Sequence, residues 1–391
     1  MPWNAMDLLD QKLMFLGDVL RDQDSFSGLC RRYGISRKTG YKWLERYRRS
    51  GLDGLNDRSS RPHGHPCRVP HAIRQEIAHL RTQGQLTLGA KKIQAKLRER
   101  HPDLEPPAIS TINKVLSQAG LSGRRRKRRR YDLYRQPLTQ TQAPHELWSV
   151  DFKGQFKLSN GQWCYPLTVM DDHSRYLLGV RGQRSVELRP TRASFRRLFQ
   201  EHGLPERIRS DNGTPFSSNA TAGLSRLSIW WVKLGIHPER ITPGKPQQNG
   251  RHERMHRTLK EAVLSQRCNS MRAQQRQFER FMRTYNAERP HEGLDMQTPE
   301  SRYDTSARRY PAKLPAIEYP SYLQVKKVSS SGAIYHLWGQ SYISHLLAGE
   351  YIGLDAIDDG IYEVYFSFYR LGRLDTTERN KEGGAYWSIK V

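Results

Sequence analysis

The chain has 391 residues, which is too long for one compact core, so we expect two to four domains. Its four cysteines lie far apart with no CxxC pair, a pattern that favours reduced thiols and gives no disulfide framework. No signal peptide opens the chain, and no apolar stretch has the length needed to cross a bilayer. We therefore expect a cytoplasmic protein with no membrane partner.

Positive charge is the strongest global signal. The formal net charge is +26, made up of +16 over residues 1–144, +9 over residues 145–306 and almost nothing over residues 307–391. A generally basic composition would give such a total with an even spread, whereas a basic front half with a neutral tail favours polyanion binding. Release of counterions from phosphates drives such binding. We therefore expect double-stranded DNA as a partner.

Residues 1–52 predict a helix-turn-helix DNA-binding domain. Gly34 breaks the chain, and Ser36 is placed to cap a third helix that runs to Arg48. In this motif the second of the two paired helices enters the major groove. The apolar residues that repeat at helical spacing ahead of the turn are Leu8, Leu9, Leu13, Leu16, Leu20, Phe26, Leu29 and Cys30. The residues expected to contact DNA are Arg37, Lys38 and Lys42. The alternative is an ordinary helical hairpin with a solvated basic face.

Residues 53–70 are rich in Gly, Pro, Ser and Asn, and they predict a linker. Within it His63, His65 and Cys67 alternate, but no fourth ligand stands at a suitable spacing, so we expect no zinc there.

Residues 71–121 predict a second helix-turn-helix domain, because they repeat the helical plan of the first. Ser110 is placed to cap the last helix and Gly120 to end it. Residues 122–143 then predict a basic linker that is extended when free and follows DNA phosphates when bound. Its basic run consists of Arg124, Arg125, Arg126, Lys127, Arg128, Arg129 and Arg130.

After Pro144 the periodicity changes, and residues 144–306 predict a domain with a mixed α/β sheet. Asn160-Gly161 suits a tight hairpin turn between the first two strands. The expected strands are 147–158, 163–170, 176–181 and 207–210, and the expected helices are 188–202, 222–234, 248–266 and 271–285. Residues 316–391 are strand-rich and predict a small all-β domain, expected to be a barrel that supports protein–protein contacts.

Three acidic residues stand in distinctive settings within the central domain. Asp151 lies on the first strand, where alternation puts it on the face opposite Trp148. Asp211 ends a later strand immediately before an Asn-Gly turn, and Glu253 lies in a predicted helix. Each acid alone is weak evidence of function, because a strand Asp or a helical Glu is more often a surface residue than a catalytic one.

Phosphodiester chemistry explains why such residues would converge. Displacement at phosphorus needs positive charge at both the attacking and the leaving oxygen. Two Mg²⁺ ions about 3.5–4 Å apart supply it, and hard oxygen ligands hold them. Arg257 and Lys260, four and seven residues after Glu253, share its helix face and are expected to contact DNA phosphates. Asn249 is expected to cap that helix or to orient Glu253.

Other ionisable residues compete for the first acid's role or for the metal. Asp171 and Asp172 lie in a turn where an ion pair or a turn cap explains them at less cost than catalysis. His252 and His256 flank Glu253, and we expect solvation or DNA contact for them rather than metal ligation.

The trio of acids, the Asp-Asn-Gly sequence at Asp211 and the segment QQNGRHERMHRTLK resemble the integrase-type catalytic core of retroviral integrases and bacterial insertion-sequence transposases. Within that group the chain is most similar to the IS-four-eighty-one branch, close to the IS-three branch. Further matching segments are Asp172–Arg175 and Tyr285–His291. The resemblance covers about residues 10–310. The chain departs from the commonest pattern in two ways. The 41 residues between Asp211 and Glu253 make a longer gap than usual, and the HHCC zinc domain of retroviral integrases is absent.

This resemblance implies an RNase-H-like fold for the core and a DDE-type polynucleotidyl transferase. Asp151, Asp211 and Glu253 would be the catalytic residues and the ligands of two Mg²⁺ ions, with Mn²⁺ as a substitute. It implies a transposase that joins the inverted ends of an insertion element to target DNA, as a homodimer or higher homo-oligomer at a bacterial nucleoid. The alternatives are a catalytically inactive helix-turn-helix regulator derived from a transposase, and a nuclease that cuts without joining.

Overall fold

The computed structural model describes residues 7–57, 69–84, 86–122, 141–242, 250–264, 267–336, 339–377 and 386–390. The chain divides into two compact units, Met1–Val69 and Pro70–Val391. The basic run Arg124–Arg130, Asn249, and the linker residues His63, His65 and Cys67 lie outside the described residues. Within the described residues, every helix is too short or too polar to cross a bilayer.

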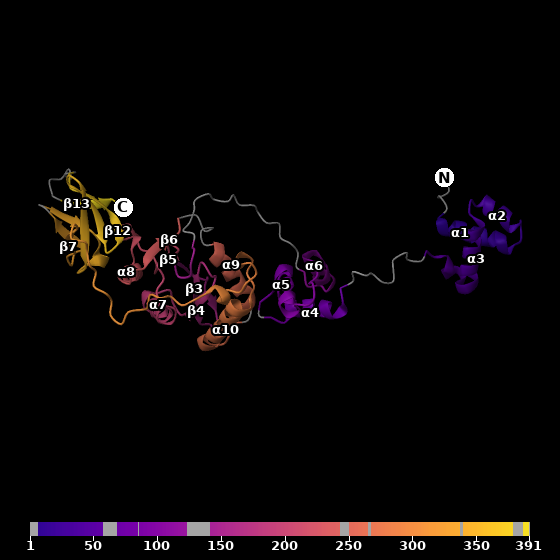
Figure 1. Ribbon diagram of the computed structural model, residues 1–391, viewed down its shortest axis with the longest axis horizontal. Coiled ribbons are helices and arrows are strands. Elements are labelled where there is room, and N and C mark those ends of the chain that lie inside the picture. Colours follow the sequence, from indigo (N-terminus) through magenta and orange to yellow (C-terminus); the bar gives the residue numbers. More distant parts are fainter. Residues whose placement is uncertain are drawn as a thin grey trace. The chain divides into compact units, whose positions relative to one another are not determined.

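The first unit is built from three α-helices and a short 3₁₀ helix (Figure 1). Its elements are α1 (Leu8–Leu20), α2 (Phe26–Arg32), α3 (Arg37–Ser50) and η1 (Gly51–Leu55). Ser36 caps α3 as expected, since its side-chain oxygen accepts a hydrogen bond from Thr39 N at 3.2 Å. Gly34, with φ of 65°, makes the turn between α2 and α3. The predicted helical, helix-turn-helix character of this region is confirmed.

The buried face of α1 differs from the one predicted. Phe15 fills the core, because its ring packs edge-on against Phe26 and Tyr33 at centroid distances of 6.0 and 5.5 Å. Leu55 is also fully buried there, so the start of the predicted linker is part of this unit. Three leucines expected in the core are instead largely exposed: Leu8, Leu13 and Leu20.

The second unit opens with three helices around a small apolar core. They are α4 (His71–Thr82), α5 (Ala90–Arg100) and α6 (Ile109–Gln118). Ser110 does not cap α6 as predicted, because the helix begins at Ile109, two residues earlier than expected, and its N-cap is Ala108. Leu86, in the loop between α4 and α5, is buried among apolar residues of the α/β domain and so joins the helices to that domain.

The α/β domain contains a six-stranded mixed sheet. Its strands are β1 (Leu147–Phe152), β2 (Phe156–Lys157), β3 (Trp163–Asp171), β4 (Leu177–Gln183), β5 (Arg207–Ser210) and β6 (His237–Arg240). β3 pairs antiparallel with β1, β2 and β4, whereas β1, β5 and β6 run parallel. Sequence patterning missed β6, because its sequence His-Pro-Glu-Arg holds a proline and two charges and shows no apolar alternation.

Helices cover both faces of this sheet (Figure 1). They are α7 (Leu188–His202), α8 (Arg226–Lys233), α9 (Gly250–Leu259) and α10 (Met271–Arg283), while the short helix η2 (Thr221–Gly223) packs against the C-terminal strands. Trp148 and Val150 of β1 share a core with α7 and α8, while Met170 and Val180 share another with α9 and α10. Both α9 and α10 continue into π-helical turns, η4 (Lys260–Leu264) and η5 (Thr284–Glu288). The predicted α/β fold class of the core is confirmed.

The C-terminal region forms a seven-stranded sheet, which confirms the predicted all-β class. Its strands are β7 (Gln324–Lys327), β8 (Ala333–His336), β9 (Gly339–Tyr342), β10 (Tyr351–Asp358), β11 (Ile361–Phe366), β12 (Tyr369–Asp375) and β13 (Tyr386–Lys390). Hydrogen bonds between the described strands run in order from β7 to β8, and these two end strands also contact each other, so the barrel stays a prediction. Ile352 and Val364 pack with Ile229 and Val232 of α8, so this sheet shares a core with the α/β domain.

Candidate active site

Three different elements carry Asp151, Asp211 and Glu253. Asp151 lies on β1, and Asp211 directly follows β5, the parallel neighbour of β1. Glu253 lies in the first turn of α9. The preceding residue, His252, forms a hydrogen bond with Ser149 of β1 at 3.0 Å. The side chain of Asp151 is 26 % exposed, whereas Glu253 is exposed to solvent.

The charges of these residues act on one another. Burial, followed by the negative charge of Asp211 and then that of Glu253, raises the pKa of Asp151 to about 7. The ammonium group of Lys153 and a main-chain hydrogen bond act in the opposite direction. A carboxyl group that resists ionisation next to other carboxylates is a position where a divalent cation would relieve repulsion, and oxygen donors are those that Mg²⁺ prefers.

The three carboxylates are neighbours without forming a closed cage. Among the residues that the structure describes, no three Asp, Glu, His or Cys side chains surround one point closely enough to hold a metal ion. Residues 243–249, which lead into α9 and include Asn249, are not among them. The donor set therefore fits a hard cation in its chemistry, while the side chains would have to move toward the ion.

The turn after β5 holds Asp211 in place. Gly213 N donates a hydrogen bond to Asp211 Oδ1 at 3.2 Å, and a Cβ on Gly213 would approach Asp211 Oδ2 to 3.0 Å. Asn212 Nδ2 donates to the main-chain oxygen of Ile241 at 2.9 Å, which ties this turn to the end of β6. The Asn-Gly pair that marked the turn in the sequence thus leaves room for the carboxylate and anchors it.

His252 and His256 are not solvated, contrary to the prediction. His252 is fully buried and His256 is 5 % exposed, because α9 turns both rings toward the sheet. Burial lowers the pKa of His256 to about 3 and that of His252 well below its usual value. Both rings are therefore neutral near pH 7.

Thr168 of β3 connects these rings to Asp151. Its hydroxyl oxygen lies 2.6 Å from His252 Nε2 and 2.8 Å from His256 Nε2, and it donates to the main-chain oxygen of Asp151 at 2.8 Å. If both neutral rings carry their proton on Nε2, Thr168 accepts two hydrogen bonds and donates one, which uses its full capacity. His256 Nδ1 lies 3.6 Å from Asp151 Oδ2, a contact between a neutral ring and a carboxyl group.

Sequence reasoning missed Thr168 and gave the two histidines the wrong environment. The histidines stand four residues apart, so they lie on one face of α9. Thr168 is the residue of β3 that pairs with Asp151 across the β1–β3 ladder, which the sequence does not give without the register.

Asp171 and Asp172 have structural partners. Asp171 is fully buried and accepts hydrogen bonds from His145 N and Ser174 N, each at 2.8 Å. Asp172 forms an ion pair with Arg251. The turn cap that the sequence favoured is present, whereas the ion pair joins Asp172 to Arg251 and not to the neighbouring Arg175.

The predicted DNA contacts lie on exposed surfaces. Arg37, Lys38 and Lys42 are exposed on the first two turns of α3. Arg257 is exposed one turn after Glu253 on α9, and Lys260 is the exposed first residue of η4. Their roles toward DNA stay predictions.

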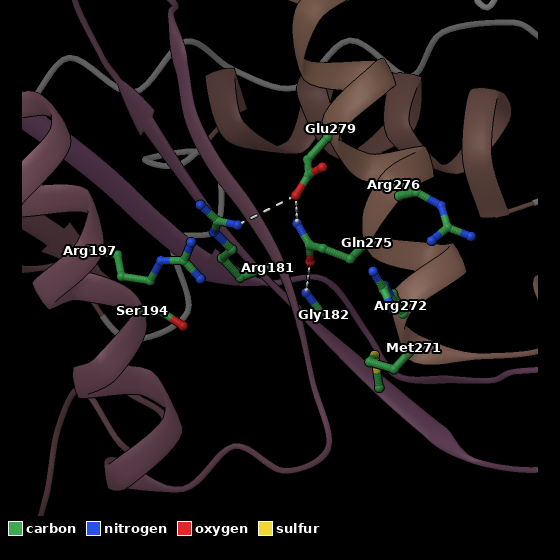
Figure 2. A pocket seen from close by; sticks show the side chains of 9 residues that line it. All are labelled: Arg181, Gly182, Ser194, Arg197, Met271, Arg272, Gln275, Arg276 and Glu279. Carbon is green, nitrogen blue, oxygen red and sulfur yellow. Dashed lines mark hydrogen bonds and ion pairs between the residues drawn. The ribbon is translucent and has the colours of Figure 1, made fainter.

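A separate hollow of about 530 Å³ lies between β4, α7 and α10 (Figure 2). None of the three carboxylates lines it. Arg181 pairs with Glu279 at 3.7 Å, and Gln275 links Glu279 to Gly182, so these polar residues hold α10 against β4. The arginines lining the hollow are Arg181, Arg197, Arg272 and Arg276.

Family models match most of the described chain. Two models described as an integrase core domain match residues 141–246 and 234–299. A helix-turn-helix domain model matches residues 12–63, and a homeodomain-like domain model matches residues 39–116. The core models therefore span all three acids, and the helical models span residues 12–116 of the predicted DNA-binding part but not its basic run.

Relatives of known origin include two proteins of bacterial insertion elements. A 31.7 kDa protein of insertion element IS407 from Burkholderia multivorans is 29 % identical over 48 % of this chain and 66 % of its own length. A 39.2 kDa protein of insertion element IS476 from Xanthomonas euvesicatoria is 29 % identical over 67 % of this chain and 73 % of its own length.

Among solved structures, the catalytic core domain of HTLV-2 integrase in complex with magnesium is 15 % identical. The alignment covers 42 % of this chain and 100 % of that one, with a TM-score of 0.33. A likeness of this size adds nothing to the sequence matches. Those matches give the chain an integrase core domain over residues 141–299 with helix-turn-helix matches ahead of it, and they make it similar to proteins of bacterial insertion elements.

Proposed function

We propose that this protein is a transposase that binds the inverted ends of an insertion element and transfers them into target DNA. The match of residues 141–299 to integrase core domains supports a polynucleotidyl transferase. The assignment of catalysis to Asp151, Asp211 and Glu253 goes further. The observation that supports it most is that the charges of Asp211 and Glu253, from two other elements, both act on the half-buried carboxyl group of Asp151.

The three carboxylates would hold two divalent cations, Mg²⁺ with Mn²⁺ as a substitute. When bound, the cations supply the positive charge that the attacking and leaving oxygens need during displacement at phosphorus. β1 fixes Asp151 through its ladder with β3, and the Asn-Gly turn fixes Asp211. Glu253 is exposed on α9, where it can reach both the cations and DNA.

The helical domains would bind the element ends, at the nucleoid. α3 presents Arg37, Lys38 and Lys42 on its first two turns, where a recognition helix meets base edges and phosphates. Arg257 and Lys260 would hold the phosphates close to the carboxylates, and the run Arg124–Arg130 would follow the DNA backbone. A homodimer or higher homo-oligomer would bring two ends together, since each end needs its own set of DNA-binding domains.

A joining assay tests this function. Purified full-length protein is mixed with supercoiled plasmid, Mg²⁺ and labelled duplexes carrying the DNA that flanks its own gene. We expect cleavage at the duplex end and covalent joining to the plasmid, both lost in Asp151→Asn, Asp211→Asn and Glu253→Gln while duplex binding persists. Binding without any reaction in the unaltered protein would favour the inactive regulator, and cut but unjoined products would favour the nuclease.

A further inference from the structure

Two sequence motifs that the catalytic proposal leaves without a role meet in the folded core. Arg175 ends the segment Asp172–Arg175 and occupies the turn between β3 and β4, with φ of 63°. Its Nη2 lies 3.8 Å from where a Cβ would stand on Gly293. Gly293 closely follows the segment Tyr285–His291, which itself folds back so that its first and last rings meet edge-on at 5.0 Å.

Two guanidinium groups and one neutral imidazole in this cluster have nitrogen atoms without a described partner. Arg175 Nη1, Arg289 Nη1 and His291 Nε2 are buried and have no hydrogen-bond partner among the described residues. Arg289 Nη2 donates a hydrogen bond to Thr258 Oγ1 at 3.3 Å. A buried donor without an acceptor costs about 1–3 kcal/mol, and more when it is charged.

The acids close to the cluster are fewer than its cations, and two of them already have partners. Asp172 is paired with Arg251, and Glu292 is paired with Lys91 at 3.0 Å. The negative charge of Glu261 also acts on Arg289. Among the described residues, the cations of the cluster therefore outnumber the acids that act on them.

Helix α5 of the preceding helical domain supplies the remaining groups. Lys92, in its first turn, is partly buried, and burial together with the charge of Arg289 lowers its pKa to about 8. The N-cap is Gly89, so no side chain caps the first turn, and no acidic residue lies in that turn. A helix N-terminus in this state favours anions through its free N–H groups and its dipole.

The positive charges in and around the cluster lower the pKa values of its members. Burial, followed by the charges of Lys92, Arg289 and Arg175, lowers the pKa of His291 to about 3. Burial and the charge of Arg251 lower the pKa of Arg175. An anion placed among Lys92, Arg175 and Arg289 would favour their charged forms and would accept a hydrogen bond from the neutral ring of His291.

We propose that Lys92, Arg175, Arg289 and His291, with the first turn of α5, form a binding site for one phosphate group of the DNA backbone. The assignment of that phosphate to DNA rests on the proposed function. Gly89, Lys91 and Gly293 are exposed at the rim of the cluster, so a phosphate can approach from solvent. Guanidinium groups suit this ligand because they donate paired hydrogen bonds to phosphate oxygens. DNA bound there would hold α4–α6 against the catalytic core.

The experiment uses full-length protein and has two arms. In the first, melting temperature is measured with inorganic phosphate against potassium chloride at equal ionic strength. In the second, binding to a labelled duplex is measured at several salt concentrations. The test variants are Lys92→Gln and Arg175→Gln, and Arg98→Gln is the matched control, because Arg98 is exposed on the same helix away from the cluster.

We expect phosphate to stabilise the unaltered protein and Arg98→Gln, but not the two test variants. Those variants should bind the duplex about tenfold more weakly, and the slope of log K against log salt should be smaller by about 0.9, the value for one lost phosphate contact. Should Arg175→Gln fail to fold, Lys92→Gln still decides, because its side chain is only partly buried.

The other outcomes are distinguishable. Phosphate stabilisation lost in the variants with an unchanged slope would overturn the DNA assignment and leave a site for a free anion. Unaltered behaviour of folded variants in both arms would overturn the site itself. Phosphate stabilisation in a protein that binds no duplex would support the site and refute the proposed function as the source of its ligand.

Discussion

Thr168 donates a hydrogen bond to the main-chain oxygen of Asp151 across 2.8 Å. The same hydroxyl oxygen contacts His252 and His256 of α9. One buried side chain on β3 thus joins the strand that carries Asp151 to the helix that carries Glu253. Two of the three proposed metal ligands are positioned relative to each other through this hydroxyl group.

Replacing Thr168 with valine keeps the shape and removes the hydroxyl. We expect Thr168→Val to lower the free energy of unfolding by about 1–3 kcal/mol, because it leaves buried partners unsatisfied. Strand transfer should slow by about tenfold to a hundredfold, as a misplaced catalytic group does. Urea unfolding and single-turnover joining measure the two effects. Thr168→Ser retains the hydroxyl and should stay close to the unaltered protein; equal rates for the valine and serine variants would rule out this positioning role.

The sequence predicted the elements whose residues have regular patterns, and it missed those that depend on pairing. The three helices of the first unit and most strands of the core follow from periodicity and from Gly34 and Ser36. β6 was missed because a proline and two charges hide an edge strand. The placement of His252 and His256 could not be predicted, since it depends on which residue of β3 lies opposite Asp151. Local sequence does not fix that register.

A methyl group on Gly213 should disturb Asp211 without straining the backbone. The added Cβ would stand 3.0 Å from Asp211 Oδ2, closer than ordinary contacts allow. We expect Gly213→Ala to raise the Mg²⁺ concentration needed for half-maximal cleavage by several-fold, since one oxygen donor is displaced. Gly154→Ala is the control, because a Cβ there meets no atom within 4 Å. Equal magnesium dependence in both variants would contradict the assignment of Asp211 as a metal ligand.

The buried His291 should make folding sensitive to acid. Its pKa is about 3 in the folded chain and about 6.5 when unfolded, so only the unfolded chain binds the proton between these values. The stability contributed by the neutral ring is complete above pH 6.5 and is lost as pH falls toward 3, by up to about 1.4 kcal/mol per pH unit. Other buried histidines act in the same direction, so the difference from a variant isolates His291.

That difference is measured as urea unfolding of the unaltered protein and of His291→Gln between pH 7.5 and 4.5. The unaltered protein should lose stability faster below pH 6.5. His79→Gln, at an exposed histidine, should follow the unaltered protein. Parallel curves for the unaltered protein and His291→Gln would mean that the ring already accepts a proton in the folded state.

The basic face of α3 should give DNA binding a strong salt dependence. Arg37, Lys38 and Lys42 are exposed on one end of the helix, and each phosphate contact contributes about 0.9 to the slope of log K against log salt. We expect residues 1–140 to bind duplex DNA with a steep slope that falls by about one in Arg37→Ala or Lys42→Ala. Fluorescence anisotropy over a salt series measures it. A shallow slope in the unaltered segment would remove this helix and the basic linker as the DNA-binding part.

Removal of the C-terminal sheet should destabilise the catalytic core, because the two share apolar contacts. Ile229 and Val232 of α8 are 7 % and 1 % exposed and pack with Ile352 and Val364. Each buried aliphatic side chain contributes about 1.5–3 kcal/mol, so a chain ending before residue 316 should unfold at lower urea and aggregate. Ile229→Gln with Val232→Thr in that shortened chain should restore solubility, since the exposed face becomes polar. A shortened chain as stable as the full one would show instead that the sheet is an independent module whose contact with α8 contributes no stability.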